Sequence, residues 1–232
     1  MSPPVVVLCY HGISDMWPSP TAVPPALFAL QLERFLEEGY VGATFTRAVL
    51  DPPAARTVAV TFDDGYRSIL EHAVPVLERL GLPGTLFVPT DRLGRGEPLA
   101  WPTLDAWLGT EHEPELSPMS WPEIAGLAES GWEIGAHTVS HPRLQLLDDA
   151  ELRHELVSSK ADVETRLGRP CVSVAYPYGD ADERVVEAAG EAGFETGAGL
   201  HVDRRRPLHW PRVCVARPET PERLWLHAQE AA

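Results

Sequence analysis

Basic residues are scarce in this chain of 232 residues, which has 19 Lys and Arg against 34 Asp and Glu. The formal charge of -15 and the pI of about 4.9 exclude an extended cationic surface. Nucleic acids and anionic membrane surfaces both select cationic partners, so the charge balance argues against either as a partner. The simplest interpretation of the acidity is solubility.

Cysteine is also rare, with only Cys9, Cys171 and Cys214 in the chain. Three cysteines cannot all pair with one another. Cys9 and Cys171 lie in apolar runs, where a buried free thiol is the expected state. Free thiols fit a reducing compartment, and we expect a cytoplasmic location.

Long hydrophobic runs are absent as well. The N-terminal apolar run, Val5 to Cys9, is too short for a membrane span or a signal peptide and follows no basic segment. It is typical of a first strand, and we expect neither a membrane span nor an export signal. The hydrophobic content of 44% is ordinary for a globular protein with a buried core.

Short apolar segments alternate with longer amphipathic ones along the whole chain. Strands are predicted at Val5 to Cys9, Thr57 to Phe62, Thr85 to Val88, Glu133 to Ala136, Cys171 to Tyr176, Glu195 to Leu200 and Arg212 to Ala216. Helices are predicted at Pro25 to Glu38, Arg67 to Leu80, Trp121 to Ser130, Asp148 to Leu167, Asp182 to Ala192 and Pro221 to Ala228. About seven such units predict an α/β fold, a distorted (β/α)7-type barrel in a single domain over residues 1–232.

One stretch breaks this alternation. Residues 90–117 are rich in Pro, Gly and acidic residues and contain Trp101 and Trp107. A long insertion after a barrel strand is often a loop that shapes the substrate site. The alternative is a surface excursion whose tryptophans pack on the barrel, and the sequence favours neither.

Polar residues follow the predicted strands at their carboxyl ends. His11 follows the first strand, Asp63 and Asp64 follow TVAVTF, His137 follows EIGA, and Tyr178 follows SVAY. In barrels of this class the catalytic groups gather where the strands end. This concentration predicts an active site at one mouth of the barrel.

Two of these clusters are typical of a metal site. Adjacent carboxylates such as Asp63 and Asp64 repel each other, and a nearby cation is the usual way to keep both ionised, although an Asp pair also suits a turn or helix cap. His137 and His141 are four residues apart, with Pro142 disfavouring a helix there. Two imidazoles and one carboxylate leave positions open on an ion, as catalytic zinc requires. Cobalt, nickel and iron accept the same ligands.

Three motifs carry a resemblance to a known family. TFDDG (61–65), HTVSHP (137–142) and AYPYG (175–179), in that order, resemble the first three motifs of the NodB-type polysaccharide deacetylases, carbohydrate esterase family 4. The opening LCYHGI (8–13) is similar to a branch of that family with an N-terminal Tyr-His motif.

The resemblance implies a metal-dependent hydrolase that removes the N-acetyl group of an amino sugar or its polymer. It makes Asp64, His137 and His141 the ligands of a divalent metal, zinc first, with cobalt or nickel as alternatives. Asp63 would be the catalytic base, and the backbone N–H of Tyr178 would donate to the oxyanion. Contacts to the substrate are assigned to Pro177, Tyr178 and Trp101.

The chain departs from the family pattern at two places. The third motif usually begins with an Arg that orients the base, but Ala175 stands there, and Arg212 is a candidate substitute. The late motif that supplies a general acid is not recognisable after Gly199. His11 is the candidate to replace it, against a purely structural role, whereas His201 and His209 are expected to be solvated.

Two further functions stay open at this point. The same site would suit a deacylase or amidase of a small intracellular molecule. A catalytically inactive carbohydrate-binding module that stacks sugars on Trp17, Trp101 or Trp107 is the other, although such a module needs no base beside a metal. Polymer and monomer substrates, and the oligomeric state, are not distinguished by the sequence.

Overall fold

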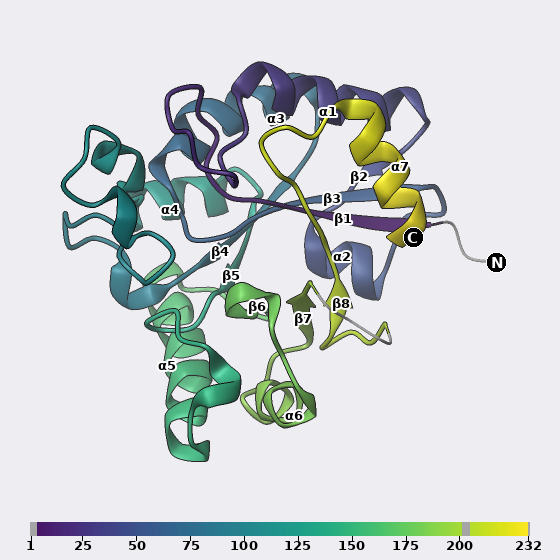
Figure 1. Ribbon diagram of the computed structural model, residues 1–232. Coiled ribbons are helices and arrows are strands. Elements are labelled where there is room, and N and C mark those ends of the chain that lie inside the picture. Colours follow the sequence, from purple (N-terminus) through teal and green to yellow (C-terminus); the bar gives the residue numbers. More distant parts are fainter. Residues whose placement is uncertain (1–3, 201–204, 232) are drawn as a thin grey trace.

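Parallel strands form a nearly closed barrel with helices around its outside (Figure 1). The computed structural model describes residues 4–200 and 205–231. The strands are β1 (Val5–Tyr10), β2 (Val41–Gly42), β3 (Thr57–Phe62), β4 (Gly84–Val88), β5 (Glu133–Ala136), β6 (Ser173–Ala175), β7 (Thr196–Gly199), β8 (Trp210–Pro211) and β9 (Val213–Cys214). Their order is β8-β7-β6-β5-β4-β3-β1-β9, with β2 beside β3.

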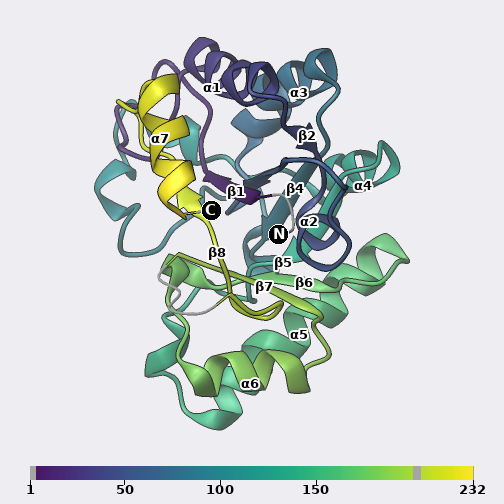
Figure 2. The same ribbon diagram turned by 90° about the vertical axis from the view of Figure 1, so that its right-hand side faces the viewer.

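Seven α-helices are assigned within the described residues. They are α1 (Pro25–Glu37), α2 (Phe45–Leu50), α3 (Val74–Leu80), α4 (Trp121–Glu129), α5 (Asp149–Leu167), α6 (Glu183–Glu191) and α7 (Pro221–Ala231). Single turns of 3₁₀-helix occur at Thr90–Arg92, Asp105–Trp107, Glu113–Leu116, Leu144–Leu146 and Pro177–Gly179. Helix α7 packs on α1, on the same side of the barrel as β1 (Figure 2).

The alternation predicted from the sequence is confirmed, with differences at three places. The segment predicted as one helix over 67–80 begins with a π-helical stretch, Ile69–Ala73, and becomes α-helical at Val74. Pro75 lacks an N–H, so it lies in the first turn of α3, where that group is not needed. Helix α2 and strand β2 were not predicted, because each is too short to show a period. The predicted last strand is reduced to β8 and β9.

The last strand segment closes the barrel. Trp210–Pro211 pairs with β7 on one side, and Val213–Cys214 pairs with β1 on the other. Arg212 lies between the two pairings, and its backbone N–H donates to Gly199 O at 3.0 Å. Its side chain is buried and therefore points into the molecule rather than to solvent.

Two hydrophobic layers cover the two faces of the sheet. Strands β1 and β3 are buried along their whole length, as expected when helices cover one face and the barrel interior covers the other. The smaller layer includes Val5, Ala59 and Phe87, and α2 contributes Phe45, whose ring meets that of Phe87 at 5.6 Å. Helix α2 therefore packs near the start of β1 and β3, and their carboxyl ends stay available for a site.

The expectations on thiols and membranes can be compared with the structure. Cys9 and Cys171 are buried free thiols, as predicted, and Cys214 is free and partly exposed. Over residues 4–200 and 205–231, no helix is both long enough and apolar enough to cross a bilayer.

Candidate metal centre and active site

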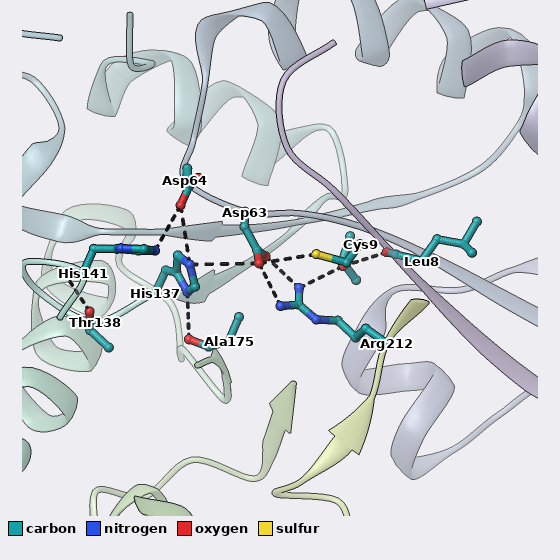
Figure 3. A network of polar contacts seen from close by, with 10 residues as sticks. Leu8, Cys9, Asp63, Asp64, His137, Thr138, His141, Ala175 and Arg212 are labelled. Carbon is teal, nitrogen blue, oxygen red and sulfur yellow. Dashed lines mark hydrogen bonds and ion pairs between the residues drawn. The ribbon is translucent and has the colours of Figure 1, made fainter. Parts of the chain in front are cut away.

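Asp64, His137 and His141 converge in the structure, although they come from two distant stretches of chain. Asp64 Oδ1 lies 3.5 Å from Nε2 of His137 and 3.5 Å from Nε2 of His141 (Figure 3). All three side chains are buried. Donor atoms about 2.1 Å from a shared tetrahedral ion lie about 3.4 Å apart, so these separations suit one cation. The three residues form a candidate metal centre, as predicted.

One hydrogen bond fixes the protonation of His137. Its Nδ1 lies 2.8 Å from the carbonyl oxygen of Ala175, at the end of β6. A carbonyl oxygen only accepts, so Nδ1 carries the proton and donates it. Nε2 then presents its lone pair toward Asp64, which is the form of imidazole that binds a metal.

One carboxylate oxygen of the candidate centre is left without a hydrogen-bond donor in the part of the chain that the structure describes. Asp64 Oδ1 is buried and has no hydrogen-bond partner among the described residues, and the same is true of His141 Nδ1. Burial raises the pKa of Asp64, and the neighbouring charge of Asp63 raises it further. A buried carboxylate oxygen without a donor is costly. A divalent cation between these three residues would remove that cost, so the residues fit the metal.

Backbone strain is concentrated at the same place. Among the described residues, four that are not glycine have positive φ: Asp64 (71°), Thr138 (66°), His141 (64°) and Tyr178 (63°). This left-handed region costs a residue with a Cβ of order 1–2 kcal/mol, and such residues cluster at functional sites. The strain aims the two candidate ligands Asp64 and His141, together with Tyr178, into one space, which regular strand geometry would not do.

Glu155 of α5 holds the loop between the two histidines. Its Oε2 accepts hydrogen bonds from the backbone N–H of Val139 at 2.7 Å and of Ser140 at 2.9 Å, and its Oε1 accepts from the Ser140 hydroxyl at 2.6 Å. Glu155 is buried. Sequence reasoning missed it. The available signal was an acidic residue on the face of the helix that carries Leu152 and Leu156.

The inserted segment over residues 90–117 supplies a wall of the site. The Trp101 ring stacks on the His141 ring, with centroids 4.2 Å apart and planes at 21°. Trp107 meets Trp17 edge to face at 5.9 Å. The segment therefore combines both roles considered from the sequence, since its tryptophans pack on the barrel and it also shapes the site.

Asp63 lies beside the metal centre but in different surroundings. Arg212 donates to both of its carboxylate oxygens, each at 2.7 Å, and also to Thr61 Oγ1 at 3.2 Å. Burial alone would raise the pKa of Asp63, but the buried Arg212 guanidinium outweighs it and holds that pKa well below its usual range. Cys9 Sγ approaches Asp63 Oδ2 at 3.5 Å. Arg212 thus orients Asp63 from the closing strand segment, whereas the family's motif Arg would stand at Ala175, at the end of β6.

These groups open onto one cleft of about 370 Å³. His11, Trp101 and Tyr178 line it together with Asp63 and the three candidate ligands. The Tyr178 ring contacts His141 at 4.8 Å between centroids, with the Arg143 guanidinium 4.2 Å above it.

Other residues considered from the sequence lie elsewhere. Pro177 is buried and is not among the residues that line the cleft. Trp17 is fully buried, so its ring is not free to stack on a sugar.

The expectation that His209 is solvated is wrong. Its side chain is buried and its ring lies 6.2 Å from that of Tyr176. A turn causes this, because Arg206 and His209 form an antiparallel bridge that folds the segment back onto the barrel. His201, the other histidine expected in solvent, lies outside the described residues.

The sequence is similar to those of two known proteins that are named as deacetylases. YxkH of Bacillus subtilis (strain 168), a provisionally assigned polysaccharide deacetylase, is 26% identical over 196 residues, which is 82% of this chain and 62% of YxkH. The poly-beta-1,6-N-acetyl-D-glucosamine N-deacetylase of Staphylococcus aureus (strain N315) is 24% identical over 174 residues, or 69% of this chain and 55% of that protein. The chain thus spans less than two thirds of either relative.

The fold also matches solved structures. The Streptococcus pyogenes deacetylase PplD, solved in complex with acetate, superposes with a TM-score of 0.79 at 22% identity, covering 97% of this chain and 98% of PplD. Residues 51–197 match the family described as polysaccharide deacetylase, and they include all three sequence motifs. This chain therefore belongs to the polysaccharide deacetylase family.

Proposed function

We propose that this chain is a divalent-metal-dependent deacetylase that hydrolyses the N-acetyl amide of an amino sugar or of its polymer. One observation carries the proposal. Asp63, oriented by Arg212, lies in the same cleft as Asp64, His137 and His141, and Asp64 Oδ1 is 3.5 Å from Nε2 of each histidine. A base beside a metal centre is the arrangement that amide hydrolysis by activated water needs.

Asp64, His137 and His141 would hold the metal. The unpartnered Oδ1 of Asp64 and the tautomer of His137 both support this role. When bound, a divalent cation polarises the acetyl carbonyl and lowers the pKa of water. Zinc is the first expectation for two imidazoles and a carboxylate, with cobalt and nickel as alternatives.

The other residues of the chain divide the remaining chemistry. Because Arg212 holds the pKa of Asp63 low, the carboxylate is ionised at neutral pH and accepts the proton of the attacking water. The backbone N–H of Tyr178 donates to the developing oxyanion, a contribution of about 3 kcal/mol for one donor. His11, in the same cleft, protonates the leaving amine.

Two features support an acetylated amino sugar as the substrate. The curated relative from Staphylococcus aureus acts on a polymer of N-acetyl-D-glucosamine, as its name states. The cleft of about 370 Å³ has Trp101, Leu104 and Trp107 along its walls, and such apolar surfaces suit the faces of a sugar ring.

The alternatives have less support. A deacylase of a small intracellular molecule would use the same residues and differs only in substrate, so a substrate panel separates the two. A binding module without catalysis leaves the strained backbone at Asp64, His141 and Tyr178 without a purpose. It would also have lost Trp17 as a sugar platform, since that ring is fully buried.

The test is acetate release from the purified protein loaded with one equivalent of zinc. The panel contains β-1,6- and β-1,4-linked N-acetylglucosamine oligomers, the monomer and small acetamides. Asp63→Asn should lower the release rate by about 10²–10⁴-fold, because a general base contributes that much, and should keep its zinc. Asp51→Asn, at an exposed Asp, is the matched control and should match the wild type.

The outcomes separate the roles. If Asp63→Asn retains most of the wild-type rate, Asp63 is not the base. If the wild type binds no stoichiometric metal and releases no acetate from any substrate, the proposed function is wrong. If only the small acetamides react, the second candidate replaces the first.

A further inference from the structure

A second cluster of metal-binding side chains lies in the barrel, apart from the three candidate ligands. One ligand atom each from Cys9, His11 and Cys214 lies within 4.8 Å of the other two. Cys9 and Cys214 are direct partners in the parallel pairing of β1 with β9. His11 follows two residues after Cys9, and alternate residues of an extended chain point to the same side. Strand register alone therefore brings the three side chains together.

The chemistry of this group is distinct from that of the first centre. Two thiols and one imidazole form a donor set for zinc and other thiophilic cations, and three protein ligands leave a position open. Neither thiol is in a disulfide. His11 Nδ1 is buried and has no hydrogen-bond partner among the described residues. An imidazole nitrogen in that state is available to an ion.

We propose that Cys9, His11 and Cys214 form a second cation site, selective for zinc or another thiophilic divalent ion. It lies on the far side of Asp63 from the first centre. Cys9 Sγ is 3.5 Å from Asp63 Oδ2, and the same carboxylate oxygen is 4.0 Å from His137 Nε2 (Figure 3). Asp63 thus stands between the two groups.

The electrostatics of the pair agree with this role. The hydrogen bond with Cys9 lowers the pKa of Cys214, opposed by burial and aided by the charges of His11 and Arg212. The thiolate is the form of cysteine that binds a metal. Cys214 and His11 are the partly exposed members of the group and both line the cleft, which gives an ion a path to the site.

Occupancy of the second site has a consequence for the proposed function, on which this step alone rests. An ion bound to the His11 imidazole removes the nitrogen lone pair that would carry a proton to the leaving amine. The second equivalent of zinc should therefore inhibit the deacetylase that the first equivalent activates. The cluster is then an inhibitory site whose occupancy depends on the concentration of free zinc.

The experiment is a cobalt titration of the reduced, metal-free protein. Cobalt bound by thiolates gives a thiolate-to-metal charge-transfer absorption in the near ultraviolet, whereas the centre of Asp64, His137 and His141 contains no sulfur. The wild type should bind two equivalents, and one of them should produce the band. Cys214→Ser should bind one equivalent without the band. Cys171→Ser, at a buried free thiol outside the cluster, is the matched control and should keep both.

His137→Ala completes the design, since it should keep the band and lose the other equivalent. Zinc added beyond one equivalent should inhibit the wild type and Cys171→Ser, and should not inhibit Cys214→Ser. A wild type that binds one equivalent without a charge-transfer band overturns the second site and leaves the proposed function intact. A protein that shows the band but loses no equivalent on His137→Ala overturns the first centre instead.

Discussion

The two adjacent aspartates stand in opposite surroundings. Asp63 faces the closing-strand region, made of Cys9, Thr61 and Arg212, where a guanidinium meets both of its oxygens. Asp64 faces the loop region, made of the loops that carry His137 and His141, where its Oδ1 has no hydrogen-bond partner among the described residues. The pKa of Asp63 is lowered and that of Asp64 is raised, although the two residues are consecutive.

The difference shows which of the two carboxylates is paired with a cationic side chain of the protein. In the closing-strand region the backbone is regular, and a cation of the protein pairs with the carboxylate. In the loop region Asp64 and His141 have positive φ, and Asp64 Oδ1 has no donor from the described residues. Two neighbouring carboxylates with separated pKa values can divide the work of a site, which agrees with the proposal that Asp63 is the base and Asp64 a metal ligand.

Breaking the closing-strand region should have the largest effect on stability. Arg212→Met leaves Asp63 as a buried charge without a partner, which costs about 3–5 kcal/mol. Urea unfolding of the metal-free variant, followed by circular dichroism, measures the loss. If the variant is too unstable to purify, the double variant with Asp63→Leu should recover most of the stability, because no charge is left uncompensated. A double variant no more stable than Arg212→Met would contradict the ion-pair explanation.

The loop region should respond in the opposite way. In the metal-free protein, Asp64→Asn should leave stability within about 0.5 kcal/mol of the wild type or raise it, because it removes a buried charge that pairs with no Arg or Lys among the described residues. Zinc at 100 times its dissociation constant should stabilise the parent by about 2.7 kcal/mol and the variant by almost nothing. Both proteins should carry Cys214→Ser, so that the second cation site does not contribute. An Asp64→Asn variant that gains the full stabilisation would exclude Asp64 as a ligand.

A smaller effect, on metal affinity, is expected at Glu155, which holds the loop between the two histidines. Glu155→Gln keeps the size of the side chain but weakens its hydrogen bonds to Val139 and Ser140, so His141 is held less firmly. Loss of such support typically lowers metal affinity by about 10–100-fold. Competition with a zinc chelator measures the affinity. Glu151→Gln, on the exposed side of the same helix, is the control and should match the wild type.

Much of the fold and of the candidate site could be predicted from the sequence. The strand and helix alternation and the polar residues at strand ends were visible as periods and positions, so the barrel and its candidate active mouth followed from local pattern. Asp64, His137 and His141 were recognised as candidate metal ligands because they lie within short motifs. Sequence-local information suffices when a role is set by a residue and its immediate neighbours.

Other parts depend on contacts between distant segments. The sequence offered Arg212 only as a candidate substitute for the motif Arg, because Arg212 reaches Asp63 across 149 positions of the chain and only barrel closure by β8 and β9 shows that the two meet. Glu155 lies on α5 and accepts a hydrogen bond from Ser140, 15 residues earlier in the chain. Nothing in the sequence of the helix itself indicates this contact. The turn that buries His209 is equally invisible in the local pattern, which is why an Arg-rich segment suggested solvent exposure.

The final prediction concerns a partly exposed counterpart of the Asp63–Arg212 pair, formed by Glu123 and Arg67. Glu123, near the start of α4, accepts from the Ser120 N–H at 2.8 Å and pairs with Arg67 at 2.9 Å, so the chain satisfies this carboxylate as well. Burial alone would raise the pKa of Glu123, but the hydrogen bonds from Ser120 and the charge of Arg67 lower it. Its contribution to stability is therefore present above its ordinary pKa of 4.5 and is lost as the pH falls through the lowered value.

Glu123→Gln should cost less than about 1 kcal/mol at pH 7, because exposed ion pairs contribute little. The difference in unfolding free energy from the wild type should shrink to zero as the pH falls below the lowered pKa. Urea unfolding at a series of pH values measures it. The Asp63–Arg212 and Glu123–Arg67 pairs are both fully partnered, so the contrast in their effects isolates burial as the cause. If Glu123→Gln costs as much as Arg212→Met, pairing rather than burial makes the closing-strand region sensitive.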